Sequence, residues 1–150
     1  MALRNRKTSR GTTISLKRAY AAPSREDGTR VLVDRIWPRG LRKESAGIDL
    51  WLKDLAPSTD LRRWFHQDAA RWPAFRRRYR AELADKGEPL ERLRHLASQG
   101  HVTLLFASAD VEHNNAVVLL QVLQARTAGA EPAQRCLRGL RDYQILTAKK

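Results

Sequence analysis

The sequence predicts a single α/β domain with a mainly parallel sheet of four or five strands, flanked by helices. Its 150 residues are enough for one compact core. The range His101–Ala107 is a nearly continuous apolar run, which is typical of a central parallel strand covered on both faces. Segments with helical spacing lie before and after this run, and a helix–strand–helix succession implies parallel strands joined by right-handed crossovers.

Two segments near the N-terminal end predict further strands. Ile14–Tyr20 alternates apolar and polar residues, as a short edge strand with one covered face does. Turn-forming residues fill 22–28, and the β-branched run Arg30–Ile36 then predicts a second strand. Pro38 and Gly40 end it.

The chain between these strands and the first long helix is less regular. Residues 41–47 predict a polar loop with a helical turn, and Ile48–Leu55 fits an extended segment, although a short helix also fits its pattern. Ser58 or Thr59 can cap a helix that runs through Phe65.

A longer helix is predicted over Trp72–Leu83. Its apolar residues Phe75, Tyr79 and Leu83 repeat at i, i+4 and i+8, and Pro73 lies in a permitted first-turn position. Because those three side chains face the core, the arginines between them must face away. These are Arg76, Arg77 and Arg80.

Two more helices flank the predicted central strand. The first begins near Pro89 and ends at Gly100. The second runs from Val111 to about Gln124, with Asp110 as its N-cap. We therefore divide the chain into a basic flexible arm (1–12), an α/β domain (13–125) and a basic C-terminal extension (126–150).

The positive charge is unevenly distributed. The chain has 29 Lys and Arg against 16 Asp and Glu, a formal net charge of +13. The excess lies in residues 1–18, 62–80 and 125–150. Such patches attract phosphate backbones without reading sequence, so a nucleic acid is a possible partner through the arm, the tail and Arg76, Arg77 and Arg80. The alternative is that these arginines only solvate the surface or contact another protein.

Composition and motifs exclude several classes of protein. No apolar stretch approaches the length of a membrane span, and the N-terminal segment lacks the apolar core of a signal peptide, so we expect a cytoplasmic protein. Cys136 is the only cysteine, and the four histidines have no zinc-finger spacing, so we expect no metal site. No glycine-rich dinucleotide or P-loop motif is present, and neither a cofactor nor an oligomeric state is predicted.

Several segments together resemble one known family. The most specific is Val-Asp-Arg-Ile-Trp-Pro-Arg-Gly at 33–40, and Trp51–Ser58 and Leu104–Asp110 followed by His113 and Asn114 agree with it. Over about residues 14–124 the chain resembles the YeaO-like family of small bacterial proteins. This resemblance implies an intracellular single-domain α/β protein; the family's function is unknown, and no catalytic residues are carried over.

Two predicted loops carry the residues best suited to chemistry. Ligands of open α/β sheets bind beyond the carboxyl ends of the strands, so the loops after Ile36 and Ala107 should meet if their strands are parallel neighbours. Together they present Asp34, Arg35, Trp37 and Arg39, and Ser108, Asp110, Glu112, His113, Asn114 and Asn115.

These residue types suit a small anionic ligand or a nucleotide. Guanidinium groups and N–H donors hold an anion, and an aromatic face can stack on a ring. The ligand-binding candidates are Arg35, Trp37, Arg39, Ser108 and Asn114. Acid/base catalysis is left open, with His113, Asp34 and Asp110 as the candidate proton-transfer groups.

Structural roles compete with each of these assignments. Asp110 can be no more than a helix cap, and Arg35 can form an ion pair with Asp34 or Asp49. Trp37 and Trp51 can simply pack against the core.

Overall fold

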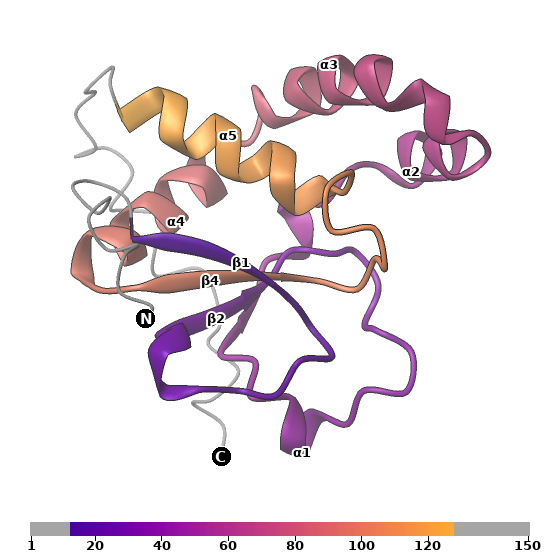
Figure 1. Cartoon of the computed structure of the whole chain (residues 1–150). Helices are drawn as coiled ribbons and strands as arrows, with labels where there is room; N and C mark the ends of the chain where they lie inside the picture. The colour runs from indigo at the N-terminus through magenta and orange to yellow at the C-terminus, as the bar shows by residue number, and fades with distance from the viewer. Residues whose placement is uncertain (1–12, 128–150) are drawn as a thin grey trace.

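The computed structural model describes residues 13–127 and contains a four-stranded parallel sheet in that range (Figure 1). The strands are β1 (Ile14–Arg18), β2 (Thr29–Leu32), β3 (Leu50–Trp51) and β4 (Val102–Phe106), in the order β1-β4-β2-β3. The predicted α/β class with a parallel sheet flanked by helices is therefore confirmed. The arm (1–12), most of the extension (128–150) and Cys136 lie outside the described residues.

The sheet is organised around β4. Val102 lies opposite Ile14 of β1 on one side and Thr29 of β2 on the other, and every residue of β4 is buried. The prediction that this run forms the middle of the sheet is confirmed, and so is the edge position of β1. The carboxyl ends of the strands point toward the side of the molecule where α2 lies (Figure 1).

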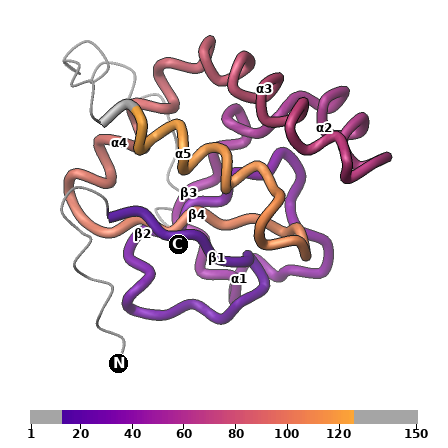
Figure 2. Tube along the Cα trace, turned by 45° about the horizontal axis from the view of Figure 1, so that its top comes forward, coloured from indigo at the N-terminus to yellow at the C-terminus, as the bar shows by residue number. Residues whose placement is uncertain are grey.

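Helices cover the two faces of the sheet unequally. The helices α2 (Thr59–His66), α3 (Trp72–Leu83), α4 (Gly87–Gln99) and α5 (Asn115–Thr127) lie on one side, and α1 (Lys43–Ala46) lies on the other (Figures 1 and 2). Short 3₁₀ turns occupy Arg25–Asp27, Lys53–Leu55 and Ala69–Arg71. Within residues 13–127, no helix has the length and apolar character that a membrane span requires.

Neighbouring residues of β4 belong to two separate hydrophobic clusters. Leu104 packs with the large cluster under α3, α4 and α5, whereas Leu105 packs with Leu32, Ala46 and Ile48 on the other face. This alternation follows from the two-residue period of a strand. It explains why the run is apolar at successive positions.

Two helical predictions are confirmed in detail. The Oγ of Ser58 accepts the N–H of Leu61, so Ser58 rather than Thr59 caps α2. The helix predicted over Trp72–Leu83 has those bounds, and its i, i+4, i+8 residues are buried. Glu82 fixes the two helices relative to each other, because its carboxylate accepts hydrogen bonds from both the backbone N–H and the hydroxyl of Ser58.

The strand predicted over Arg30–Ile36 is shorter than expected. Regular β2 pairing ends at Leu32, and the next backbone N–H, that of Val33, still donates to Leu105. Beyond that point the Asp34 carboxylate accepts the N–H of Ala107, so a side chain replaces the ladder bond. The extended segment predicted over Ile48–Leu55 is likewise limited to β3, which is followed by a 3₁₀ turn.

The helix predicted to begin at Val111 begins at Asn115. Asp110 does not cap it; its carboxylate accepts the N–H groups of Glu112 and His113 within the preceding bend. The cap is Asn114, whose Oδ1 accepts the N–H of Val117. Both Asp and Asn are good N-cap residues, and the bend at 111–114 places the second one at the helix start.

Candidate ligand-binding cleft

A cleft of about 490 Å³ opens at the carboxyl ends of β2 and β4. Because these strands are parallel neighbours, the two loops that follow them meet there, as predicted. Eight of the ten loop residues singled out in the sequence line the cleft: Asp34, Arg35, Trp37, Arg39, Ser108, His113, Asn114 and Asn115. Asp110 is not among its lining residues. The volume lies within the range of cavities that hold small organic ligands.

The loop after β2 is fixed by two tryptophans. The indole N–H of Trp51 donates to the backbone oxygen of Asp34 at 2.7 Å, and that of Trp37 donates to Leu41 at 2.7 Å. The two rings meet edge to face with centroids 5.4 Å apart. Trp37 packs against the smaller hydrophobic cluster and also lines the cleft. Its packing role is therefore compatible with its position as a candidate ligand contact.

The loop after β4 is held from the edge strand. Arg18 of β1 donates from Nε to the backbone oxygen of Ser108 and from Nη2 to that of Ala107, both at 2.9 Å. The same guanidinium lies over the ring of Tyr20 at 5.2 Å, and the Tyr20 hydroxyl donates to the backbone oxygen of Arg39. These contacts join the loops that follow β1, β2 and β4.

His113 and Asp110 form an exposed pair at the cleft rim. Their Nδ1 and Oδ2 atoms are 3.1 Å apart, and their side chains are 45% and 50% exposed. The backbone N–H groups of His113 and Glu112 hold the pKa of Asp110 below its usual value. The imidazole also meets Trp72 edge to face, with centroids 5.0 Å apart.

Asp34 is a half-buried residue of the cleft lining. Its Oδ2 accepts the N–H of Ala107 at 2.9 Å, and the Asn115 amide is its second hydrogen-bonding neighbour. Burial raises the pKa of Asp34, although these hydrogen bonds and the nearby charge of Arg62 act in the opposite direction. Removing a carboxylate from water disfavours its charged form.

Asn115 joins Asp34 to the core beneath the cleft. Its amide donates to the backbone oxygen of Val33 at 2.9 Å, and it lies beside the hydroxyl of Tyr79. That hydroxyl donates to the backbone oxygen of Leu55, and burial raises the pKa of Tyr79 far above its ordinary value.

The cationic side chains of the cleft differ in their contacts. Arg35 donates to the backbone oxygens of Pro57 and Ala56, so the proposed ion pair with Asp34 or Asp49 is not formed. Arg39 and Arg62 line the cleft, and neither guanidinium has a hydrogen-bond or ion-pair partner within residues 13–127.

Sequence reasoning missed Arg62 and His66. Both line the cleft from α2, where they are spaced i, i+4 and so share a face. Burial and the Arg62 charge lower the pKa of His66. The i, i+4 spacing of an arginine and a histidine near the end of a predicted helix could have identified this pair, but nothing in the sequence placed that helix beside the strand ends.

The Asp34 pKa gives a prediction about stability. Because the folded-state pKa lies above the unfolded value near 3.8, the folded protein binds more protons, and Asp34 makes the free energy of unfolding fall as pH rises from about 4 through the raised pKa. Asp34→Asn should remove this contribution. Urea unfolding of both proteins at a series of pH values measures it, and a parent-minus-variant difference that does not change with pH would contradict the prediction.

The arginines considered for nucleic-acid binding have mixed surroundings. Arg76 and Arg80 approach Gln121 of α5 at 3.5 and 3.4 Å, and Arg77 is exposed. Arg78 lies over the ring of Trp64 at 4.2 Å. The predicted contact with a nucleic acid stays a prediction.

Comparison with known proteins identifies the family of this chain. The family described as "Inactive DUF488-N3 subclade" matches residues 13–137. An uncharacterized protein of Mycobacterium tuberculosis is 42% identical over 117 residues, which cover 78% of this chain and 98% of the relative. The uncharacterized protein YeaO of Escherichia coli is 39% identical over 112 residues, 75% of this chain and 97% of the relative. No solved structure gives a significant match. The chain therefore belongs to this DUF488 subclade, and its resemblance to YeaO is confirmed.

Proposed function

We propose that the protein binds a small anionic molecule in the cleft at the carboxyl ends of β2 and β4. The observation that carries this proposal is the pair Arg39 and Arg62, which line the cleft without a partner within the described residues. Arg62 is half-buried, and a guanidinium in a partly enclosed site gains more from an anion than an exposed one such as Arg39, because water screens it less. His66 and His113 add hydrogen-bonding nitrogens to the same cleft.

Binding without catalysis is the form of function that these observations favour. The candidate pair Asp110 and His113 is exposed, and Asp110 does not line the cleft. The description of the matching family contains the word "inactive". The proton-transfer roles considered for His113, Asp34 and Asp110 stay predictions and are not part of this proposal.

The test is a ligand screen followed by a comparison of matched arginine variants. Thermal unfolding with nucleotides, phosphorylated sugars and carboxylates should identify a stabilising ligand, and isothermal titration then gives its Kd. Arg62→Gln should weaken binding by about tenfold to a hundredfold, because a charge-assisted hydrogen bond contributes about 1.5–3 kcal/mol. Arg39→Gln should act in the same direction.

Arg63→Gln is the control, because Arg63 is the exposed neighbour of Arg62 on α2 and does not line the cleft. Its Kd should stay within about twofold of the parent value, as expected for an exposed charge. If no anion stabilises the parent, or if Arg63→Gln weakens binding as much as Arg62→Gln, the proposal is wrong.

A further inference from the structure

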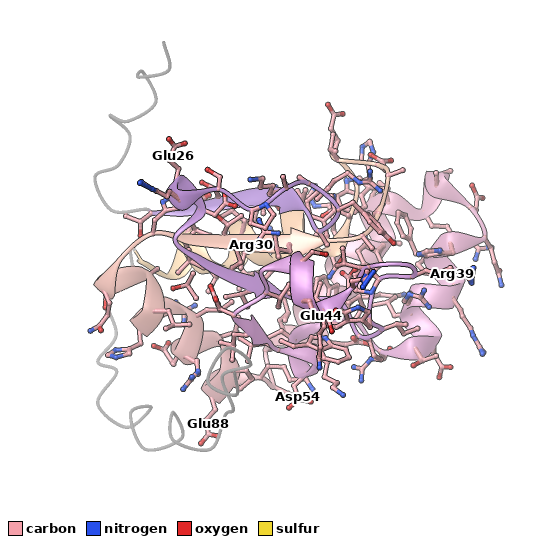
Figure 3. The ribbon with its side chains drawn as sticks, turned by 90° about the horizontal axis from the view of Figure 1, so that it is seen from below. Glu26, Arg30, Arg39, Glu44, Asp54 and Glu88 are labelled. Carbon is pink, nitrogen blue, oxygen red and sulfur yellow. The ribbon has the colours of Figure 1, made fainter. Side chains whose placement is uncertain are left out.

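The cleft is lined by groups of both charges. Arg39, one of its cationic residues, projects from the loop after β2 and lies apart from the buried Arg30 (Figure 3). Asp34 is the one carboxylate among the cleft-lining residues that the structure describes. A ligand that fills the cleft must therefore meet cationic groups and a carboxylate acceptor.

Asp34 keeps unused capacity to accept hydrogen bonds. A carboxylate offers about four lone-pair sites. The described neighbours that donate to it are the Ala107 N–H and the Asn115 amide. The Arg62 charge lies nearby, but neither it nor another cation forms an ion pair with Asp34 within residues 13–127. A half-buried carboxylate with open acceptor sites is stabilised by a further donor, and a second anion placed there would be repelled.

We infer that Asp34 binds a hydroxyl or amino group of the ligand, so that the cleft takes an organic anion carrying hydrogen-bond donors rather than a bare or apolar anion. This inference rests on the proposed function, in which the arginines hold the anionic group. The chemical class is a hydroxylated or amino-bearing phosphate or carboxylate, such as a sugar phosphate or a sugar acid. The cleft volume of about 490 Å³ leaves room for such a body beside the anionic group.

Asp34 is well placed to bind a ligand selectively because hydrogen bonds restrain both its backbone and its side chain. Trp51 fixes its backbone oxygen, and Ala107 and Asn115 bond to its carboxylate. Asn115 is in turn bonded to the backbone oxygen of Val33. A group held in this way loses little conformational freedom when a ligand binds, which favours selectivity.

The experiment compares ligands that share an anionic group and differ in donors. Ribose 5-phosphate is compared with phenyl phosphate, and gluconate with benzoate, by isothermal titration against the full chain. The hydroxylated member of at least one pair should bind the parent at least about tenfold more tightly, as one hydrogen bond to a charged group predicts. The pair that shows the difference identifies the anionic group as phosphate or carboxylate.

Asp34→Asn tests whether Asp34 causes this preference. The amide keeps an acceptor for the Ala107 N–H but loses the charge and places a donor beside the cleft. The preference should fall below about threefold, whereas phenyl phosphate or benzoate should bind as tightly as before or more tightly, because repulsion is removed. Equal weakening of both members would mean that Asp34 only holds the loops, and would overturn the inference.

A measurement on the unaltered protein covers the case in which the variant does not fold. The amide resonance of Ala107, which donates to Asp34, should shift with ribose 5-phosphate or gluconate and much less with phenyl phosphate or benzoate. If both members of each pair bind equally and Arg62→Gln weakens them all, the inference fails and the proposed function stands. If none of the four binds, both fail for these ligand classes.

Discussion

Replacing Arg30 with methionine should cost about 3–5 kcal/mol of folding free energy, the range measured when one partner of a buried ion pair is removed. Arg30 is only 3% exposed, and its Nη1 bonds to the Asp27 carboxylate at 2.6 Å. Its other nitrogens donate to the backbone oxygens of Ala46, Gly47 and Ala21. Methionine fills part of the volume but leaves these acceptors unsatisfied.

Urea unfolding measures this loss, and Arg42→Met is the matched control. Arg42 and Glu44 are 76% and 80% exposed and lie at the limit of ion-pair distance, so their contact contributes little. The control should change the free energy of unfolding by less than about 0.5 kcal/mol. A cost for Arg30→Met as small as that of the control would show that the buried network does not stabilise the fold.

Arg30→Met should also change how the free energy of unfolding depends on pH in the acid range. Burial opposes the charged form of Asp27, but hydrogen bonds from Lys17 and Arg30 outweigh it and hold the Asp27 pKa below its ordinary value. The stability that Asp27 contributes is therefore present above its unfolded pKa of about 4 and is lost as pH falls through the lower folded value. Without Arg30, part of this acid-dependent loss should disappear.

Leu105→Ala should destabilise the protein by about 2–5 kcal/mol, because it leaves a cavity in the core. Leu105 is fully buried on β4 and packs with Leu32, Ala46 and Ile48. Trp37 packs against the same cluster, so the wall of the cleft depends on this packing. Thermal and urea unfolding measure the loss.

Arg39→Ala and His113→Ala provide the contrast with Leu105→Ala. Both side chains are exposed and line the cleft, so each substitution should change the free energy of unfolding by less than about 1 kcal/mol. Their effect should appear in ligand binding. If either variant unfolds as readily as Leu105→Ala, that residue is structural and its assignment to the site is wrong.

The parts of the fold that could be predicted are those in which local pattern and tertiary packing agree. Phe75, Tyr79 and Leu83 repeat at helical spacing and are buried in the structure, so the bounds of α3 follow from the sequence. The unbroken apolar run of β4 likewise reflects two covered faces. The meeting of the loops at Asp34 and Ser108 followed from the parallel order of β2 and β4.

Other features depend on contacts that a single sequence does not display. The first residue of α5 is set by a choice between Asp110 and Asn114, two side chains of similar capping strength, and the bend between them decides it. The place of Arg62 in the cleft depends on how α2 packs over the strand ends. Neither the periodicity nor the composition of the sequence predicts how α2 packs against the sheet.

The hydrogen bonds from Arg18 to the loop after β4 connect the edge strand of the sheet to the cleft. An outer strand is usually the part of a sheet where substitutions have the least consequence for a site elsewhere. Here its last residue holds the backbone oxygens of Ala107 and Ser108, and Tyr20 just beyond it holds Arg39. Substitutions in β1 and in the cleft loops should therefore have non-additive effects, and the periphery of the sheet has to be treated as part of the site when variants are combined.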